Sequence, residues 1–182
     1  GAIPGAPSGS TDDPFPGWAQ QIVGRERDPN NPAAKNPDSN ATGDGQFMPD
    51  TWRGMIKNYR PDLLKGRTDA QIMDLRKDPR LSLQMTEAYA RQNAGILNNQ
   101  GLPVTGDTVR LSHFLGPQAA ATTLQATPDT PMSMLVPKVV IEKNPWMAQQ
   151  TAGGMVQWAA RQMGRPAPAP AAPPGTPPGT MV

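Results

Sequence analysis

The sequence contains no cysteine and only one histidine, His113, among its 182 residues. Without cysteine the chain can form no disulfide, no zinc–thiolate site and no cysteine nucleophile. A single histidine leaves little material for a metal site. We therefore expect no metal and no other cofactor. The compartment stays open, because a cysteine-free protein is equally suited to the inside and the outside of a cell.

Long apolar runs are missing as well. No stretch approaches the roughly 20 apolar residues that are needed to cross a bilayer, and the first residues lack the basic-then-apolar pattern of a signal peptide. The chain begins with Gly1 rather than methionine. We expect no membrane span, and we interpret the chain as a processed product or an excised piece of a longer protein.

Charge of either sign is sparse and scattered. The 17 Lys and Arg residues exceed the 15 Asp and Glu residues by a formal net charge of +2, and no Lys/Arg run occurs. Such a mild excess suits an anionic polymer as partner but is too diffuse to indicate nucleic acid. A solvated basic surface explains it equally well.

Proline and glycine are abundant, with 23 and 18 residues, and many of the prolines lie at the two ends. Residues 1–16 and 166–182 contain few large apolar side chains, so neither segment can bury enough surface to offset its ordering entropy. We predict an N-terminal linker over residues 1–16, one domain over residues 17–165 and a Pro-rich tail over residues 166–182.

The central domain carries helical periodicity almost throughout. Trp52, Met55, Ile56 and Tyr59 follow the i, i+3, i+4, i+7 spacing of an amphipathic helix. Only residues 138–143, "KVVIEK", suggest the period of two that is typical of a strand. We predict an all-α domain.

Capping residues indicate where these helices begin and end. Asp50 or Thr51 can cap the helix that contains Trp52, Thr68 and Gln71 have capping-box spacing, and Asp78 followed by a proline opens a long helix. Gly164 is placed as a left-handed C-cap of the last helix.

The chemistry that this composition supplies best is acid–base catalysis by a carboxylate. Glu26 ends an amphipathic segment and precedes a polar loop rich in Asn and Pro. Burial of such a carboxylate favours its protonated form, which could donate a proton near neutral pH. Taken alone, the pattern fits a surface glutamate between Arg25 and Arg27 better.

A second segment, "GDGQFMPDT" at residues 43–51, makes a catalytic role of Glu26 the better interpretation. Together with a helix-terminal glutamate and an Asn-Pro loop, it resembles the soluble lytic transglycosylase family. The second motif of that family is Gly-Leu-Met-Gln-hydrophobic-Met-Pro-x-Thr. The sequence matches this motif at Gly43, Gln46, Met48, Pro49 and Thr51, with Phe47 in the hydrophobic position.

The resemblance implies the α-helical, goose-type lysozyme-like fold and cleavage of the β-1,4 bond between N-acetylmuramic acid and N-acetylglucosamine in peptidoglycan. Glu26 would protonate the leaving oxygen, and the substrate's acetamido group would stabilise the anomeric carbon. The same glutamate would then deprotonate the muramyl C6 hydroxyl as the 1,6-anhydro ring closes. One carboxylate would serve twice, whereas most glycosidases use two.

The resemblance also implies a wall for the sugar cleft. Gly43 and Gly45 would allow close approach of a saccharide or of the catalytic helix. Gln46 would contact the sugar or the Glu26 carboxyl through its amide, beside Phe47. The glycines and Gln46 would equally suit a plain turn that enters the next helix.

Two further residues are candidates for substrate binding. In "SHFLG", His113 stands where the family's third motif, Ala-Tyr-Asn-x-Gly, has tyrosine, and it could hydrogen-bond the acetamido group or the C6 hydroxyl. A structural role suits a lone histidine equally well. The family's late tyrosine has no counterpart; Tyr89 could face the cleft, although a core position fits it better.

Departures from the family pattern keep two alternatives open. Arg27 replaces the serine that follows the glutamate and could weaken Glu26 as an acid. A hydrolysing lysozyme would need a second acid, and a degenerate domain would bind glycan or build a virion without cutting. The candidates for the second acid are Asp28, Asp38, Asp44 and Asp50.

The expected partner is the glycan strand of peptidoglycan, with no nucleic acid and no membrane span. We expect the protein to act in the periplasm or cell wall. Delivery as part of a phage virion or a secretion machine would agree with the Pro-rich ends.

Overall fold

The computed structural model describes residues 12–27 and 41–164 of the chain. Its regular elements are all helical, so the predicted all-α class is confirmed for this part of the chain. The 1–11, 28–40 and 165–182 segments, with most of the predicted linker and tail, lie outside the described residues. The α-helices are α1 (Phe15–Arg27), α2 (Pro49–Tyr59), α3 (Asp69–Asp74), α4 (Pro79–Asn99), α5 (Gly106–Leu115), α6 (Pro117–Gln125), α7 (Lys138–Lys143) and α8 (Ala152–Gln162).

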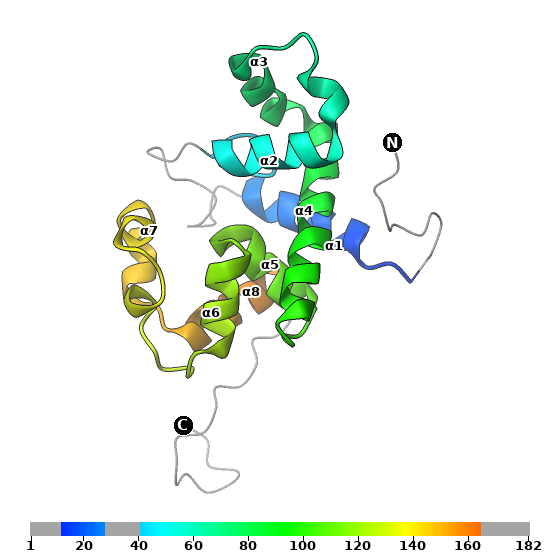
Figure 1. The fold of residues 1–182 in the computed structure, drawn as a ribbon. Coiled ribbons are helices and arrows are strands. Elements are labelled where there is room, and N and C mark those ends of the chain that lie inside the picture. The colour runs from blue at the N-terminus through cyan, green and yellow to red at the C-terminus, as the bar shows by residue number, and fades with distance from the viewer. Residues whose placement is uncertain (1–11, 28–40, 165–182) are drawn as a thin grey trace, which may run out of the picture.

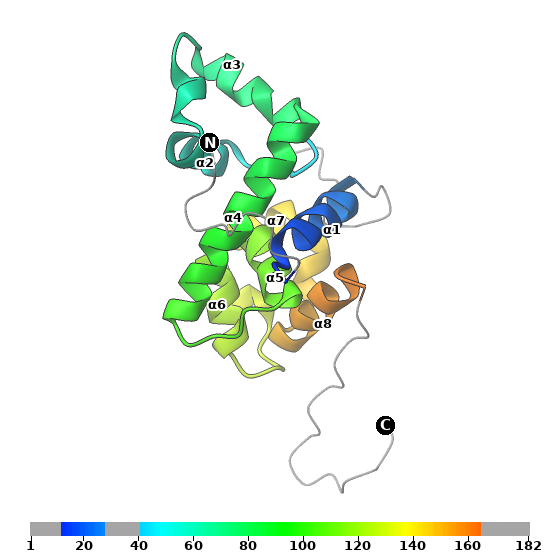
Figure 2. The ribbon, with the colours of Figure 1, turned by 90° about the vertical axis from the view of Figure 1, so that its right-hand side faces the viewer.

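Helix α4 is the spine of the molecule. Figure 1 shows α2 and α3 near its N-terminal end and α5 and α6 beside its C-terminal half, and Figure 2 shows α1 lying against it. This arrangement gives an upper lobe of α2 and α3 and a lower lobe of α5 to α8. No helix in the described ranges is long and apolar enough to cross a membrane.

The upper lobe packs around Trp52, which is fully buried and donates its indole N–H to the Ile72 carbonyl at 2.8 Å. Because a buried indole N–H without an acceptor is costly, this bond fixes α3 against α2. The apolar cluster continues onto α4 through Met85 and Tyr89.

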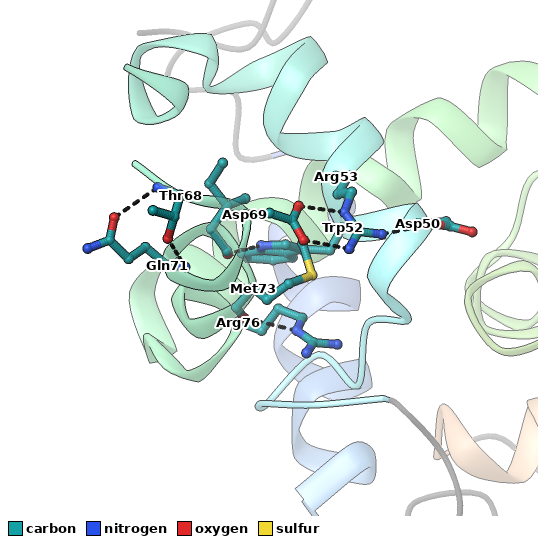
Figure 3. Close-up of polar contacts among 9 residues, drawn as sticks. Asp50, Trp52, Arg53, Thr68, Asp69, Gln71, Met73 and Arg76 are labelled. Atoms are coloured by element: carbon teal, nitrogen blue, oxygen red, sulfur yellow. Dashed lines mark hydrogen bonds and ion pairs between the residues drawn. The ribbon is translucent and has the colours of Figure 1, made fainter. Parts of the chain in front are cut away.

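On the surface of the same lobe, Arg53 joins α2 to α3. Its guanidinium donates to both carboxylate oxygens of Asp69 at 2.8 Å and to Asp50 at 2.9 Å (Figure 3). These bonds lower the pKa of the Asp69 carboxyl. The ion pairs are exposed, so they set the orientation of α3 more than they stabilise the fold.

The lower lobe has its own apolar core between α5, α6 and α8, closed by the segment that carries α7. Phe114, Trp146 and Trp158 form an aromatic cluster there, with ring centroids 5.1–5.7 Å apart. Large aromatic surfaces dominate core energetics, so this cluster anchors the 3-10 turn that follows α7, which carries Trp146, to α5 and α8.

Most predicted helix boundaries are confirmed. Thr68 and Gln71 form a capping box, the Asp78 carboxylate caps α4, and Gly164 has the positive φ of 70° expected of a C-cap. The predicted cap of α2 is wrong, because α2 begins at Pro49 and the N-cap position falls on Met48, which makes no side-chain bond.

Two other expectations need correction. Residues 138–143 form a helix, α7, in place of the short alternating segment, since Val139, Val140 and Lys143 share one face at helical spacing. The packed chain also starts before residue 17. Asp13 pairs with Arg91 on α4, and α1 opens at Phe15.

The loop over residues 41–48 is fastened to the 3-10 turn Leu75–Lys77, which precedes α4. An antiparallel bridge joins Thr42 to Phe47, and Arg76 donates to the Phe47 carbonyl at 3.1 Å. Gly43 has a φ of 78°, and a Cβ atom there would lie 1.7 Å from the Arg76 carbonyl oxygen. Only glycine therefore fits this point of the loop.

We predict that Gly43→Ala lowers the free energy of unfolding by about 2–4 kcal/mol, because it combines a left-handed backbone penalty with a backbone clash. Urea denaturation measures the change. Gly54→Ala, on the exposed face of α2 with no atom near its Cβ position, should instead stabilise by up to about 1 kcal/mol. Equal stabilities for Gly43→Ala and the wild type would contradict the role given to this glycine.

Candidate active site

A cleft of about 320 Å³ opens between the two lobes. The 41–48 loop and the start of α2 form one wall, the end of α5 with Gly116 forms the floor, and α7 forms the other wall. Its lining residues are Glu26, Ala41, Gln46, Phe47, Met48, Thr51, Tyr89, His113, Phe114, Leu115, Gly116, Val139, Val140, Lys143 and Asn144.

Glu26 lies at the C-terminal end of α1, where that helix reaches the cleft. The residue is only 6% exposed, although it lines the cleft. Ile22 and Val23, which precede it in α1, are buried, so the apolar face of the helix directs the carboxylate inward. The sequence left two positions open for Glu26, an exposed one and a buried one at the helix end, and the structure shows the buried one.

Arg110 contacts Glu26, and sequence reasoning missed this contact. The Arg110 Nη1 atom lies 2.6 Å from Glu26 Oε1, and the two side chains are 0% and 3% exposed. Arg110 stands three residues before His113 on α5, so the helical period places both on one face. This spacing could have placed Arg110 on the same side of α5 as His113. Nothing in the sequence indicated that Arg110 pairs with Glu26, which lies 84 positions away.

His113 reaches across the cleft floor to the 41–48 loop. Its Nε2 lies 2.8 Å from the Gly45 carbonyl oxygen and donates to it in the neutral tautomer that this contact requires. The ring also packs edge-on against Phe47 and Tyr89. Burial lowers the pKa of His113, although the nearby Glu26 carboxylate acts in the opposite direction.

Gln46 lines the cleft in an unusual backbone conformation. Its φ is 51°, the only positive value outside glycine in the described chain, and its side-chain Nε2 donates to the Gly43 carbonyl at 2.7 Å. Backbone strain of this kind collects at ligand-binding sites. The amide nitrogen is thus engaged within the turn and is not bonded to Glu26.

Gly43 and Gly45 do not line the cleft. The space above Gly45 is taken by the Phe47 ring and the Thr86 hydroxyl, each within 3 Å of a Cβ atom placed there. The two glycines therefore allow other parts of the protein to approach the loop closely. Arg76, in the turn before α4, approaches Gly43, and Thr86 on α4 approaches Gly45.

Phe47 and Tyr89 belong both to the cleft and to the upper core. Phe47 is 3% exposed and packs against Trp52 and Tyr89, with ring centroids 5.3 and 5.8 Å apart. Burial raises the pKa of the Tyr89 phenol. Both line the cleft although they are almost fully buried, so they also support the wall behind it.

Helix α7 supplies the wall that sequence reasoning did not foresee. Val139 and Val140 give it an apolar surface, while Lys143 and Asn144 add polar groups. Val139 is 49% exposed. The cleft therefore has an apolar wall on the α7 side as well as amide and hydroxyl groups among its lining residues.

The described acids near the loop do not reach the cleft. Asp50 pairs with Arg53 on the outer surface, and Asp44 is not among the lining residues. Asp28, Asp38 and the side chain of Arg27 lie outside the described part of the structure. Glu26 is therefore the one carboxylate that the described residues bring into the cleft.

No model of a known protein family matches the chain, and no solved structure matches it.

We predict that acid selectively destabilises the wild type through His113. Because the folded pKa is depressed, the unfolded state takes up the proton first as pH falls below about 6.5, at a cost of up to about 1.4 kcal/mol per pH unit. Urea denaturation at pH 7.5 and 5.5 should show a smaller loss for His113→Gln. Equal losses in the two proteins would contradict the buried, neutral histidine.

We also predict that the Glu26–Arg110 pair behaves as a unit in stability measurements. Arg110→Gln should cost about 3–5 kcal/mol, because it leaves a buried carboxylate uncompensated. The double variant Glu26→Gln/Arg110→Gln should be more stable than Arg110→Gln alone. Additive losses in this double-mutant cycle would show that the two groups do not interact.

Proposed function

We propose that the protein is a peptidoglycan lytic transglycosylase with a goose-type lysozyme-like fold and Glu26 as its acid and base. One observation carries this proposal. The two segments on which the family resemblance rests, the glutamate that ends α1 and the 41–48 loop with Gln46 and Phe47, lie on the same cleft. They are separated in sequence, and nothing in their local patterns requires them to meet.

The shape and chemistry of the cleft support a glycan substrate. Its volume of about 320 Å³ lies at the lower end of the range of ligand sites, about 300–1,000 Å³, and it is open to a longer chain. Polar groups from Gln46, Thr51 and Asn144 line it together with apolar surface from Phe114 and Val140. This mixture fits the alternating polar and apolar surfaces of N-acetylated sugars.

The proposed reaction breaks the bond between the muramyl C1 atom and the bridging oxygen. Glu26 gives its proton to that oxygen as the bond breaks, and the substrate's acetamido oxygen stabilises the electron-poor C1. The C6 hydroxyl oxygen then bonds to C1, and its proton returns to Glu26. The balance closes without water, and a single carboxylate suffices, which agrees with Glu26 being the one described acid in the cleft.

A glycan-binding domain that does not cut is the second candidate, and the ion pair favours it. Arg110 Nη1 donates directly to Glu26 Oε1, so one oxygen of the carboxylate is already engaged within the protein. The same cleft would then hold the glycan without transferring a proton.

We predict that the protein releases fragments with 1,6-anhydromuramyl ends from purified murein, as read by mass spectrometry. Glu26→Gln should reduce release by at least about 10²-fold, because proton transfer by a placed acid contributes about 10²–10⁴. The matched control is Glu87→Gln, which changes a glutamate on α4 that pairs with Arg91 outside the cleft and should leave release unchanged.

The other outcomes of this experiment would assign a different function to the protein. Reducing muramyl ends would assign a hydrolase. Binding to murein without release would assign the glycan-binding domain, and full activity of Glu26→Gln would show that another group is the acid.

A further inference from the structure

Positive charge gathers in the segment that runs from α2 to the start of α4. Residues 49–80 hold eight of the 17 Lys and Arg residues but only five of the 15 Asp and Glu residues, so the rest of the chain holds nine of the first kind and ten of the second. The net positive charge of the chain therefore comes from this segment. Its part around α3 forms the end of the molecule opposite α6 and α8 (Figure 1 and Figure 2).

The acids of this segment are all engaged, whereas several of its cations are not. Each carboxylate either pairs with a cation of the segment or caps α4, namely Asp50 and Asp69 with Arg53, Asp62 with Arg60, Asp74 with Lys77, and Asp78 at the helix start. The cations of the segment that pair with no carboxylate of the described residues are Lys57, Lys65, Arg67 and Arg80. These four side chains are exposed, so the segment presents unmatched positive charge on its surface.

Two of the unmatched cations line one hollow of about 260 Å³, which we call the arginine hollow. Arg67 comes from the loop before α3, Arg80 from the first turn of α4, and Arg60 lines the hollow beside them. Arg60 is already matched by both carboxylate oxygens of Asp62. Arg67 donates from Nη1 to the Leu63 carbonyl at 3.1 Å. The other N–H groups of its guanidinium, and those of Arg80, remain for a ligand.

The arginine hollow has an apolar base. Leu81 is buried in the upper core, and Leu63 and Leu75, which also line the hollow, pack against that core. Asp78 is the one acid among the described residues that line it, and its carboxylate already accepts from the backbone N–H groups of Arg80 and Leu81 at 2.9 and 3.2 Å. The hollow therefore combines unmatched positive charge with aliphatic surface.

This combination selects a ligand that carries a carboxylate beside aliphatic groups. A guanidinium is a planar fork that matches a carboxylate or a phosphate. The leucine base favours the carboxylate of a peptide, because a polyol–phosphate or sugar–phosphate chain brings no aliphatic side chain to bury. The volume of about 260 Å³ lies just below the range of about 300–1,000 Å³ for ligand sites, so the hollow suits the last one or two residues of a peptide.

We propose that the arginine hollow is a second binding site, which takes the C-terminal carboxylate of a short peptide with small aliphatic side chains through Arg67 and Arg80. None of its lining residues lines the cleft, so the two sites are separate. The peptides that branch from the muramyl units of peptidoglycan end in such residues, and naming them as the source rests on the proposed function. The cleft then holds the glycan while the hollow holds a peptide of the wall.

NMR with the peptide acetyl-Lys-D-Ala-D-Ala tests the site without any glycan. In isotope-labelled protein, the backbone amide signals of Arg67, Arg80 and Leu81 should shift as the peptide is added, whereas those of Gln46 and Asn144 in the cleft should stay in place. The matched ligand is the same peptide with a C-terminal amide. It lacks the carboxylate and should cause no shift at these positions.

Variants of the two arginines give the second comparison. Arg67→Gln and Arg80→Gln should each weaken peptide binding by about two- to fivefold, because each removes one exposed charge contact, and the double variant should weaken it further. Both side chains are exposed, so we expect the variants to fold. Lys57→Gln is the charge-matched control, since Lys57 is an exposed, unmatched cation on α2 outside the hollow, and it should leave the affinity unchanged.

Several outcomes would overturn the inference. Equal shifts with the amidated peptide would show that no carboxylate is recognised, and shifts confined to the cleft would place the peptide there. Equal affinities of the double variant and the wild type would remove the arginines from the site. Shifts of the same amides with poly(glycerol phosphate), but none with the peptide, would assign the hollow to a phosphodiester polymer in place of a peptide.

The titration separates this inference from the proposed function. A protein that binds the carboxylate peptide but releases no fragments from murein overturns the proposed function and leaves the arginine hollow as a carboxylate site. A protein that cuts murein but does not bind the peptide overturns the inference about the hollow alone.

Discussion

A guanidinium and a carboxylate, both shielded from water, tie the first helix of the molecule to the fifth. Neither group could remain buried alone, since an unpaired charge in this interior would cost several kcal/mol. Their mutual need fixes where α1 ends relative to α5, and Gln162 and Trp158 extend the constraint to α8. This junction of α1, α5 and α8 forms the base on which the floor of the cleft is built.

The wall above that floor is held by different physics. The 41–48 loop is too short to form an apolar core of its own, so it packs against the core of the upper lobe. Phe47 enters the upper cluster, Gly43 lies against the Arg76 carbonyl, and the Gly45 carbonyl accepts a hydrogen bond at His113. His113 and Arg110 both lie on α5. This helix therefore contacts the 41–48 loop through His113 and Glu26 through Arg110, and it fixes their relative positions.

Local signals in the sequence predicted much of the fold. Several of these signals depend only on near neighbours in the sequence: the caps at Thr68 and Asp78, the glycine at position 164, and the helical period of Trp52, Met55 and Ile56. They predicted the positions of these helices correctly. Glu26 and Gln46, which both line the cleft, could be proposed as site residues because their motif is local too. The Arg110 contact and the α7 wall depend on which helices meet in space, so no local period encodes them. The "KVVIEK" segment was misleading because six residues are too few to separate the two periods.

The central claim is that the Glu26 carboxyl transfers a proton within this cleft. A crystal structure of the protein with a bound muramyl disaccharide that carries the 1,6-anhydro ring would test it most directly. We predict that the sugar lies between the 41–48 loop and α7, with its ring oxygens within about 3.2 Å of Glu26 Oε2 and Arg110 still on Oε1. A disaccharide bound outside the cleft, or one that lies in it with no oxygen near Glu26, would contradict the account.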